Sequence, residues 1–202
     1  MSELARFAAV AEVDADLGLL TAAEVARHDR LVMPADQQAY AAAHVLAREC
    51  AASLLGTTRD GVVVQQRCVR CGSAEHGAPY VAGSSLQVSL SHARGYVAAV
   101  AATRACGIDV EAISRGPDRA LSEREAVWVG EQEDAAYAFT RLWVRKEALV
   151  KAGHGTMAAA HDLDVLDVGS PADRVGGLGL VEWSGEGFAG AVAVAADVPD
   201  QP

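Results

Sequence analysis

Apolar and polar residues alternate along several short stretches of the chain, and each stretch predicts a β-strand. The clearest case is Leu86, Val88 and Leu90, which alternate with polar residues at the period of a half-buried strand. A turn at residues 93–95 precedes the apolar run 96–102, so we expect a hairpin there. Further strands are expected at residues 7–13, 61–66, 105–111, 163–168, 178–183 and 188–195.

Two short patterns mark the starts of helices. Thr21 is followed three positions later by Glu24, and Ser122 is followed in the same way by Glu125. This spacing is the capping box, in which the hydroxyl and the carboxylate each accept a hydrogen bond from the other residue's backbone N–H. We therefore expect helices to begin after Thr21 and Ser122, the second one extending over residues 122–129.

Two longer helices are expected from composition and from their stop signals. The alanine-rich stretch 37–55 is followed by Gly56, and the periodic stretch 134–152 is followed by Gly153. Glycine commonly ends a helix because it adopts a left-handed backbone without strain. The remaining glycine-containing segments, residues 71–79 and 176–179, are expected to form a loop and a turn.

The expected elements follow the order strand, helices, strands, and then the same order again. This order predicts an α+β fold of two similar α/β subdomains, although no repeat is visible residue by residue. We place the boundary so that residues 1–104 form the first subdomain and residues 105–202 the second. Ligand clefts commonly lie at such interfaces, so the active site is expected between them.

Composition limits the classes of partner. The 202 residues are 51% hydrophobic, and 27 acidic residues against 17 basic ones give a formal net charge of −10. Such a balance argues against nucleic acid or an anionic membrane as the main partner. The first residues lack the features of a signal peptide, and no run reaches about 18 apolar residues. We therefore expect a cytoplasmic protein.

Cys68 and Cys71 have the spacing of half a zinc site. The sequence offers no second Cys-x-x-Cys or histidine pair to complete that site. Reduced thiols are therefore the preferred interpretation for these residues in a cytoplasmic protein.

The candidate chemistry lies in two segments about three dozen residues apart. In the expected strand, Asp109 and Glu111 are alternate residues, so their carboxylates share one face. In the long helix, Trp143, Glu147 and Lys151 recur every four residues along one stripe. Carboxylates that bind a hard cation, with a lysine beside them, suit chemistry on a pyrophosphate.

These segments resemble the phosphopantetheinyl transferases of the surfactin-synthetase-activating type. The family pattern Gly-apolar-Asp-apolar-Glu is similar to residues 107–111, and Trp-x-x-Lys-Glu-Ala-x-x-x-Lys is similar to residues 143–151. A Ser-x-Ser-His strand end occurs at residues 89–92. The resemblance covers most of the chain, and it implies a pseudo-twofold pair of subdomains with the active site between them.

The resemblance implies a specific reaction. A holo-[carrier-protein] synthase of this type transfers the 4′-phosphopantetheine arm of coenzyme A to a serine of an apo acyl- or peptidyl-carrier protein and releases 3′,5′-adenosine bisphosphate. The implied Mg²⁺ ligands are Asp109, Glu111 and Glu147. The implied catalytic residues are Glu147 and Lys151. The implied coenzyme A contacts are Ser91, His92, Asp109 and Lys151, with Lys151 on the pyrophosphate. Either Glu147 or a metal-bound water that it orients would be the base.

The resemblance also implies the partners of the protein. These are carrier proteins of polyketide, nonribosomal peptide or fatty acid synthases, and the motif form is typical of members that serve secondary-metabolite biosynthesis. A monomer is expected, with no nucleic-acid or membrane partner. At Ala78, family members usually have a lysine or arginine. Recognition of the 3′-phosphate of coenzyme A is therefore expected to depend on substitutes, for which Arg67, Arg70 and His76 are close enough in sequence.

Simpler interpretations remain open for single residues and for the whole chain. Lys146 could be an ordinary solvated helix charge, and Trp143 is expected to be a core residue. The arginines Arg27, Arg30 and Arg48 are expected to be solvated helix charges, unless one of them reaches a cofactor phosphate. The whole chain could instead be a degenerate module that binds coenzyme A or a carrier protein without turnover. It could also be a different metal-dependent phosphotransferase or hydrolase.

Overall fold

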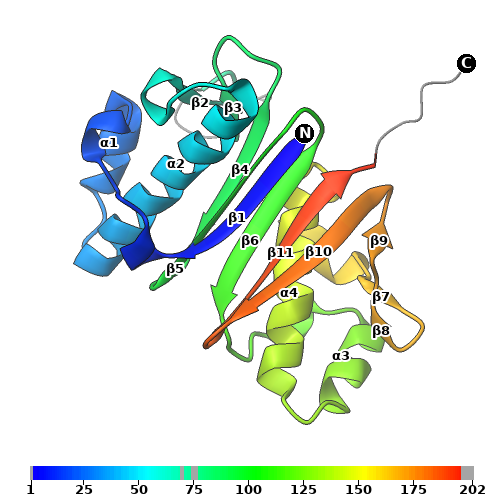
Figure 1. Ribbon diagram of the computed structural model, residues 1–202. Coiled ribbons are helices and arrows are strands. Elements are labelled where there is room, and N and C mark those ends of the chain that lie inside the picture. Colours follow the sequence, from blue (N-terminus) through cyan, green and yellow to red (C-terminus); the bar gives the residue numbers. More distant parts are fainter. Residues whose placement is uncertain (1, 69–70, 74–76, 197–202) are drawn as a thin grey trace, which may run out of the picture.

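The computed structural model describes residues 2–68, 71–73 and 77–196, and within them the protein has four layers (Figure 1). Helix α2 (Pro34–Leu55) packs on one face of a five-stranded sheet, and strands of that sheet lie against strand β6 (Cys106–Ala112) of a four-stranded sheet. Helix α4 (Ala135–Lys151) covers the opposite face of this second sheet. The layers therefore follow the order helix, sheet, sheet, helix.

The five-stranded sheet is built entirely from residues before Arg104. Its strands have the order β1-β5-β4-β3-β2, and every neighbouring pair is antiparallel. The strands are β1 (Glu3–Ala9), β2 (Val64–Arg67), β3 (Ala78–Val81), β4 (Gln87–His92) and β5 (Tyr96–Ala102).

The second sheet is built from residues after Arg104 and has the order β6-β11-β10-β9, again antiparallel. Beside β6, its strands are β9 (Arg174–Val175), β10 (Leu178–Gly185) and β11 (Phe188–Ala195). A separate two-stranded hairpin consists of β7 (Leu166–Asp167) and β8 (Ser170–Pro171).

A short helix precedes each long one: α1 (Ala22–His28) precedes α2, and α3 (Glu123–Gly130) precedes α4. Both predicted capping boxes are present, with Thr21 and Ser122 as the N-caps. Gly56 ends α2 at a φ of 65°, as glycine can without strain. The 3₁₀ helices are Val10–Glu12, Leu17–Leu19, Arg59–Gly61, Asp118–Ala120 and Met157–Asp162.

Four sequence predictions of element bounds were wrong. The first strand spans Glu3–Ala9 rather than residues 7–13, and Val10–Glu12 forms a 3₁₀ turn. The strand expected at 61–66 begins only at Val64, because Arg59–Gly61 is a 3₁₀ turn. The expected loop 71–79 ends earlier, since Ala78 and Pro79 belong to β3 and pair with β2. The strand expected at 163–168 is reduced to Leu166–Asp167.

An apolar layer joins the two sheets. It includes Val100 of β5 and Ile108 and Val110 of β6, all fully buried, so the prediction that Ile108 and Val110 point into a core is confirmed. At one end of this layer, Phe7 and Trp183 stack with their ring centroids 4.9 Å apart. Burial of such side chains holds β6 against β4 and β5, which is what brings Asp109 close to Ser91.

The fold is thus a mixed α+β arrangement of antiparallel sheets and helices, as predicted. The subdomain boundary at residues 104 and 105 stays a prediction. Among the described helices, none is both long and apolar enough to cross a membrane.

Candidate functional site

A cavity of about 370 Å³ lies where the two halves meet, and we call it the central cavity. All six side chains that the sequence analysis assigned to the site line it. They are Ser91 and His92 from β4, Asp109 and Glu111 from β6, and Glu147 and Lys151 from α4. Residues more than fifty positions apart in sequence therefore converge on one space.

Gly107 explains how strand β6 and helix α4 come so close together. A Cβ atom at this position would lie 2.0 Å from the backbone oxygen of Ala148 and 2.6 Å from the backbone nitrogen of Ala152. Both distances are shorter than any real contact, so only glycine fits there. Because Asp109 lies two residues further along the strand and Glu147 precedes Ala148, this close approach places both carboxylates at the same cavity.

Asp109 is the buried centre of the site, with 2% of the residue exposed. Its Oδ1 accepts a hydrogen bond from the Ser91 hydroxyl at 2.7 Å and from the Lys151 ammonium at 2.6 Å. Lys151 Nζ also donates to the Ile108 carbonyl at 3.2 Å. By contrast, Asp109 Oδ2 is buried without a hydrogen-bond partner. A buried carboxylate oxygen of this kind is costly unless something binds it.

The other two carboxylates sit in an environment that disfavours negative charge. Burial, followed by the charges of Asp109 and Glu147, raises the pKa of Glu111 to about 7. Burial and the charge of Asp109 also raise the pKa of Glu147, while Lys151 acts in the opposite direction. Three acidic side chains are thus held close enough to repel one another, and a bound cation would relieve that repulsion.

The donor chemistry of this group fits Mg²⁺, which prefers carboxylate oxygens. The unpartnered Oδ2 of Asp109 and the mutual repulsion of the carboxylates both favour a bound cation. In residues 2–68, 71–73 and 77–196, however, no three His, Cys, Asp or Glu side chains are grouped as they would be around a metal ion. Lys151 already holds one oxygen of Asp109. The residues therefore suit the metal chemically, and binding it requires their side chains to draw together.

Aromatic and histidine rings form another part of the wall of the central cavity. Tyr40 of α2 lies between His44, at 4.0 Å between ring centroids, and His92, at 5.9 Å. Burial lowers the pKa of His44 to about 4, and burial together with Lys151 lowers the pKa of His92. Both histidines are therefore neutral near pH 7, so they can donate a hydrogen bond to an anion in this cavity but add no positive charge.

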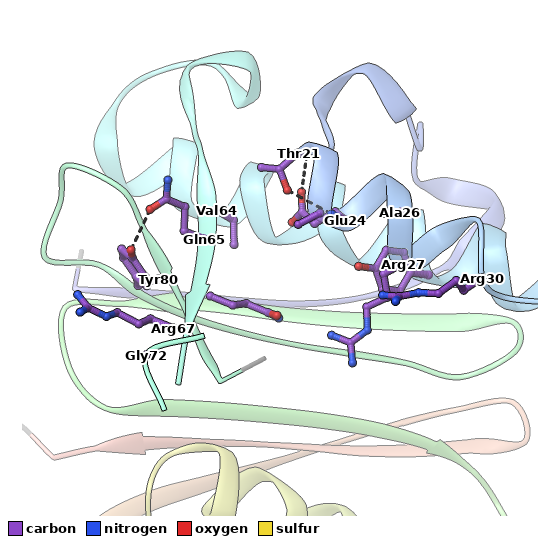
Figure 2. Close-up of a pocket in the computed structure, with 13 residues that line it drawn as sticks. Thr21, Glu24, Ala26, Arg27, Arg30, Val64, Gln65, Arg67, Gly72 and Tyr80 are labelled. Carbon is purple, nitrogen blue, oxygen red and sulfur yellow. Dashed lines mark hydrogen bonds between the residues drawn. The ribbon is translucent and has the colours of Figure 1, made fainter. Parts of the chain in front are cut away.

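A second cavity of about 500 Å³ opens beside the first, between helix α1 and the β2–β3 hairpin; we call it the α1 cavity (Figure 2). Arg27, Arg30 and Arg67 line it, while Tyr80 donates a hydrogen bond to Gln65 at 2.8 Å on the hairpin side. It shares three lining residues with the central cavity: Arg27, Tyr40 and Gln66. The two cavities therefore adjoin. Positive charges lie on both sides of the α1 cavity, with Arg27 and Arg30 near α1 and Arg67 on the hairpin.

The position of Ala78 is clear from the same hairpin. Ala78 pairs with Arg67 across β2 and β3, so the arginine stands directly beside the alanine that occupies the family's basic position. Arg67 thus lies next to the position of the expected cation, and its role as a substitute stays a prediction. Arg70 and His76, the two other substitutes that the sequence suggested, lie outside the described residues.

A third cavity of about 250 Å³, the α4 cavity, lies on the other side of Glu111. Glu111 lines both this cavity and the central one, so it separates the two spaces. Gly116 and Pro117, from the loop after β6, face Phe139 and Trp143 of α4 here. Trp143 packs against the second core, as predicted, and it also forms part of this cavity wall.

Two expectations about charged residues were wrong. Lys146, for which an ordinary solvated helix charge was an open interpretation, is fully buried, and Arg48 is 1% exposed. Arg27 and Arg30 are exposed, as expected of solvated helix charges, and both line the α1 cavity. The sequence analysis missed Tyr40 and Gln66, because neither belongs to a motif and only the fold brings them to the cavities.

Residues 105–193 match the family model of the 4′-phosphopantetheinyl transferase superfamily. The matched segment contains Asp109, Glu111, Glu147 and Lys151. The second half of the chain is therefore similar to the domain of this superfamily. No curated protein matches the chain.

Proposed function

We propose that the protein is a Mg²⁺-dependent holo-[carrier-protein] synthase of the surfactin-synthetase-activating type. It would transfer the phosphopantetheine arm of coenzyme A to a serine of an apo acyl- or peptidyl-carrier protein. The observation that carries this proposal is the row of three adjacent cavities that share lining residues, with the carboxylates and Lys151 at the middle one. Coenzyme A is elongated and reacts at an internal pyrophosphate, and it therefore needs binding space on both sides of the reacting group.

The α1 cavity suits the nucleotide end of coenzyme A. Arg27, Arg30 and Arg67 offer guanidinium groups that match phosphate geometry. The chain as a whole has a net charge of −10, so binding of an anionic cofactor depends on such a local cluster. With the nucleotide there, the pyrophosphate would reach the central cavity past Arg27, which lines both spaces.

In the central cavity, Asp109, Glu111 and Glu147 would hold Mg²⁺, which offsets the negative charge that develops on the leaving bisphosphate. Lys151 adds a second positive charge next to Asp109. Ser91 holds Asp109 in place through its hydrogen bond, and this leaves the Oδ2 atom of Asp109 to face a ligand.

The carrier serine has to lose its proton as its hydroxyl attacks the β-phosphorus. Glu147 lines the central cavity together with Asp109 and Lys151, and it is the proposed proton acceptor there. Glu147 therefore takes the proton directly or orients a water that does so. The two alternatives lead to the same products, with the bond from phosphorus to the bisphosphate oxygen broken and the bond to the serine oxygen formed.

The test is intact-mass analysis of a panel of apo-carrier proteins incubated with the protein, coenzyme A and Mg²⁺. At least one carrier is expected to gain the mass of one phosphopantetheine arm, and a chelator is expected to abolish the gain. Asp109→Asn serves as the matched variant, because it removes a proposed ligand while keeping the shape of the side chain. Coenzyme A binding without modification of any carrier would contradict the proposal.

A non-enzymatic binding module is the second candidate, and one observation favours it. Lys151 holds Asp109 at 2.6 Å, and the described carboxylates are not grouped around a metal position. If this ion pair persists in solution, coenzyme A would bind without turnover. Calorimetric titration with Mg²⁺ in the presence of coenzyme A separates the two candidates, since only the enzyme needs the metal.

A further inference from the structure

Lys146 and Glu125 form an ion pair sealed inside the second half of the molecule. Both side chains are 0% exposed, and Lys146 Nζ lies 2.6 Å from Glu125 Oε2. The ammonium also donates to the carbonyls of Ala120, at 3.1 Å, and Ala160, at 2.7 Å. A lysine has three N–H donors, so all of them are used here.

Glu125 is equally well satisfied. Its Oε1 accepts from the backbone N–H of Val165 at 2.9 Å, and its Oε2 accepts from the N–H of Ser122 at 2.7 Å. The pair therefore joins α3, α4, the 3₁₀ turn before α3, the 3₁₀ turn of residues 157–162 and the segment that leads into β7. A buried ion pair is weak evidence for stability alone, because apolar residues often stabilise a core equally well; what distinguishes this pair is the set of backbone segments that it holds in place.

The loop after β6 is fastened to α4 at two points. Near its start, the Thr140 hydroxyl both accepts from the N–H of Ser114 and donates to its carbonyl, each at 3.0 Å. Near its end, Lys146 holds the carbonyl of Ala120. The stretch 115–119 between these two tethers contains Gly116 and Pro117, which form one wall of the α4 cavity.

This wall fits closely against the helix. A Cβ atom on Gly116 would lie 2.3 Å from the ring of Phe139, so the loop has no room to move toward α4. It can move only outward, and the two tethers oppose that movement. Arg115 and Arg119 of the same stretch are exposed, and with one acidic residue in residues 115–119 the stretch has a formal charge of +1 in an acidic protein.

We propose that Lys146, held by Glu125, is a positioning residue that fixes the wall made by Gly116 and Pro117 and thereby controls how an acidic acceptor protein reaches the central cavity. Lys146 lines none of the three cavities described above, so it acts through the loop rather than on the reactants. The inference rests on the proposed transferase function for its acceptor, whereas the positioning itself is independent of turnover.

The decisive variant is the double substitution Lys146→Met with Glu125→Leu, which removes the tether without leaving a buried unpaired charge. Thr140→Val, which removes the other tether, is the matched companion. Both variants should raise the KM for the carrier protein at least about tenfold, since a small misplacement of a binding wall has large kinetic effects. The dissociation constant of 3′,5′-adenosine bisphosphate should stay within about twofold, because the α1 cavity is remote from the loop.

A second readout does not require turnover. Hydrogen–deuterium exchange should become faster in residues 113–121 of the double variant, while Glu3–Ala9 and Tyr96–Ala102 exchange as in the wild type. Unchanged exchange in residues 113–121 would overturn the positioning role. Faster exchange with an unchanged carrier KM would overturn the link to the acceptor.

An equal loss of carrier and bisphosphate binding would also overturn that link, because such a loss would indicate general loosening of the protein. A wild type that modifies no carrier would refute the transferase, and the exchange data would still decide the positioning.

Discussion

In each half of the molecule an ion pair joins a short helix to a long helix, but only in the second half is that ion pair completely buried. In the first half, the capping-box residue Glu24 of α1 accepts a hydrogen bond from Arg48 of α2 at 2.6 Å. In the second half, the capping-box residue Glu125 of α3 pairs with Lys146 of α4, also at 2.6 Å. The Glu24 side chain is 12% exposed and lines the α1 cavity, whereas Glu125 is fully buried.

This difference shows how one local pattern can serve two purposes. Glu24 lines the α1 cavity, and its ion pair with Arg48 offsets a negative charge that would otherwise repel an anionic ligand there. Glu125 and Lys146 contact only protein groups, so their charges fix the relative position of backbone segments. Four residues before each cation, the contrast continues: His44 faces the central cavity, while Leu142 is completely buried.

The largest expected effect tests the sealing of the second pair. Lys146→Met alone leaves Glu125 charged, buried and unpaired, and should lower the free energy of unfolding by about 3–5 kcal/mol. Arg48→Met should lower it by only about 1–2 kcal/mol, because water can reach Glu24. Urea denaturation of both variants at one pH measures the difference. Equal losses would show that the partial exposure of Glu24 does not matter, and the comparison would fail.

The sequence predicted local structure well where the signal was local. The capping boxes at Thr21 and Ser122, the stop at Gly56 and the hairpin of β4 and β5 all follow from neighbouring residues. It failed where burial depends on the rest of the fold. Nothing near Lys146 in the sequence indicates that its charge meets Glu125 about twenty residues earlier, inside the core.

The candidate site was predictable in its motifs and not in its surroundings. The spacing of Asp109, Glu111, Glu147 and Lys151 suggested one cluster, and these side chains line one cavity; their roles stay a prediction. The pairing of Lys151 with Asp109 was not foreseen, since it depends on the distance between β6 and α4 that Gly107 permits. Tyr40 comes from the other half of the chain, and only the packing of the sheets brings it near.

The second prediction uses the pH dependence of stability at His44. Burial, as the main cause, lowers the pKa of His44 from 6.5 to about 4, with Glu24 opposing the shift and Arg48 and His92 adding to it. The unfolded chain therefore binds a proton below pH 6.5 that the folded protein refuses until about pH 4. The contribution of His44 to the free energy of unfolding is therefore fully present above pH 6.5. It falls by up to about 3 kcal/mol as the pH drops to 4.

His44→Leu, which copies Leu142 of the other half, should remove that contribution. The free energy of unfolding of the variant should fall less steeply than that of the wild type between pH 6.5 and 4, with parallel curves above pH 7. Chemical denaturation at a series of pH values measures both curves. Curves that stay parallel down to pH 4 would mean that His44 takes up its proton in the folded protein.

The third prediction compares the two N-caps. Thr21 and Ser122 accept hydrogen bonds from the N–H groups of Glu24 and Glu125, at 3.3 and 3.2 Å. Replacing either by alanine should lower the free energy of unfolding by about 1 kcal/mol. The loss at Ser122 should be the larger one, because freeing the first turn of α3 also loosens the buried pair. A larger loss at Thr21 would indicate that the partly exposed pair of Glu24 and Arg48 is coupled more tightly to its N-cap than the buried pair is.

The smallest expected effect concerns the binding wall itself. Arg27→Gln of α1 removes one charge from the wall shared by the α1 and central cavities. Because this arginine is exposed, the loss of coenzyme A affinity should be only about 0.5–1 kcal/mol, or roughly two- to fivefold. Arg124→Gln on α3 is the matched control, since Arg124 contacts the carbonyl of Leu166 and lies outside both of these cavities. Calorimetric titration should show weaker coenzyme A binding for the first variant alone. Equal binding by both variants would mean that Arg27 does not contact the cofactor. The functional contrast between the two halves would then depend on the carboxylates of the central cavity.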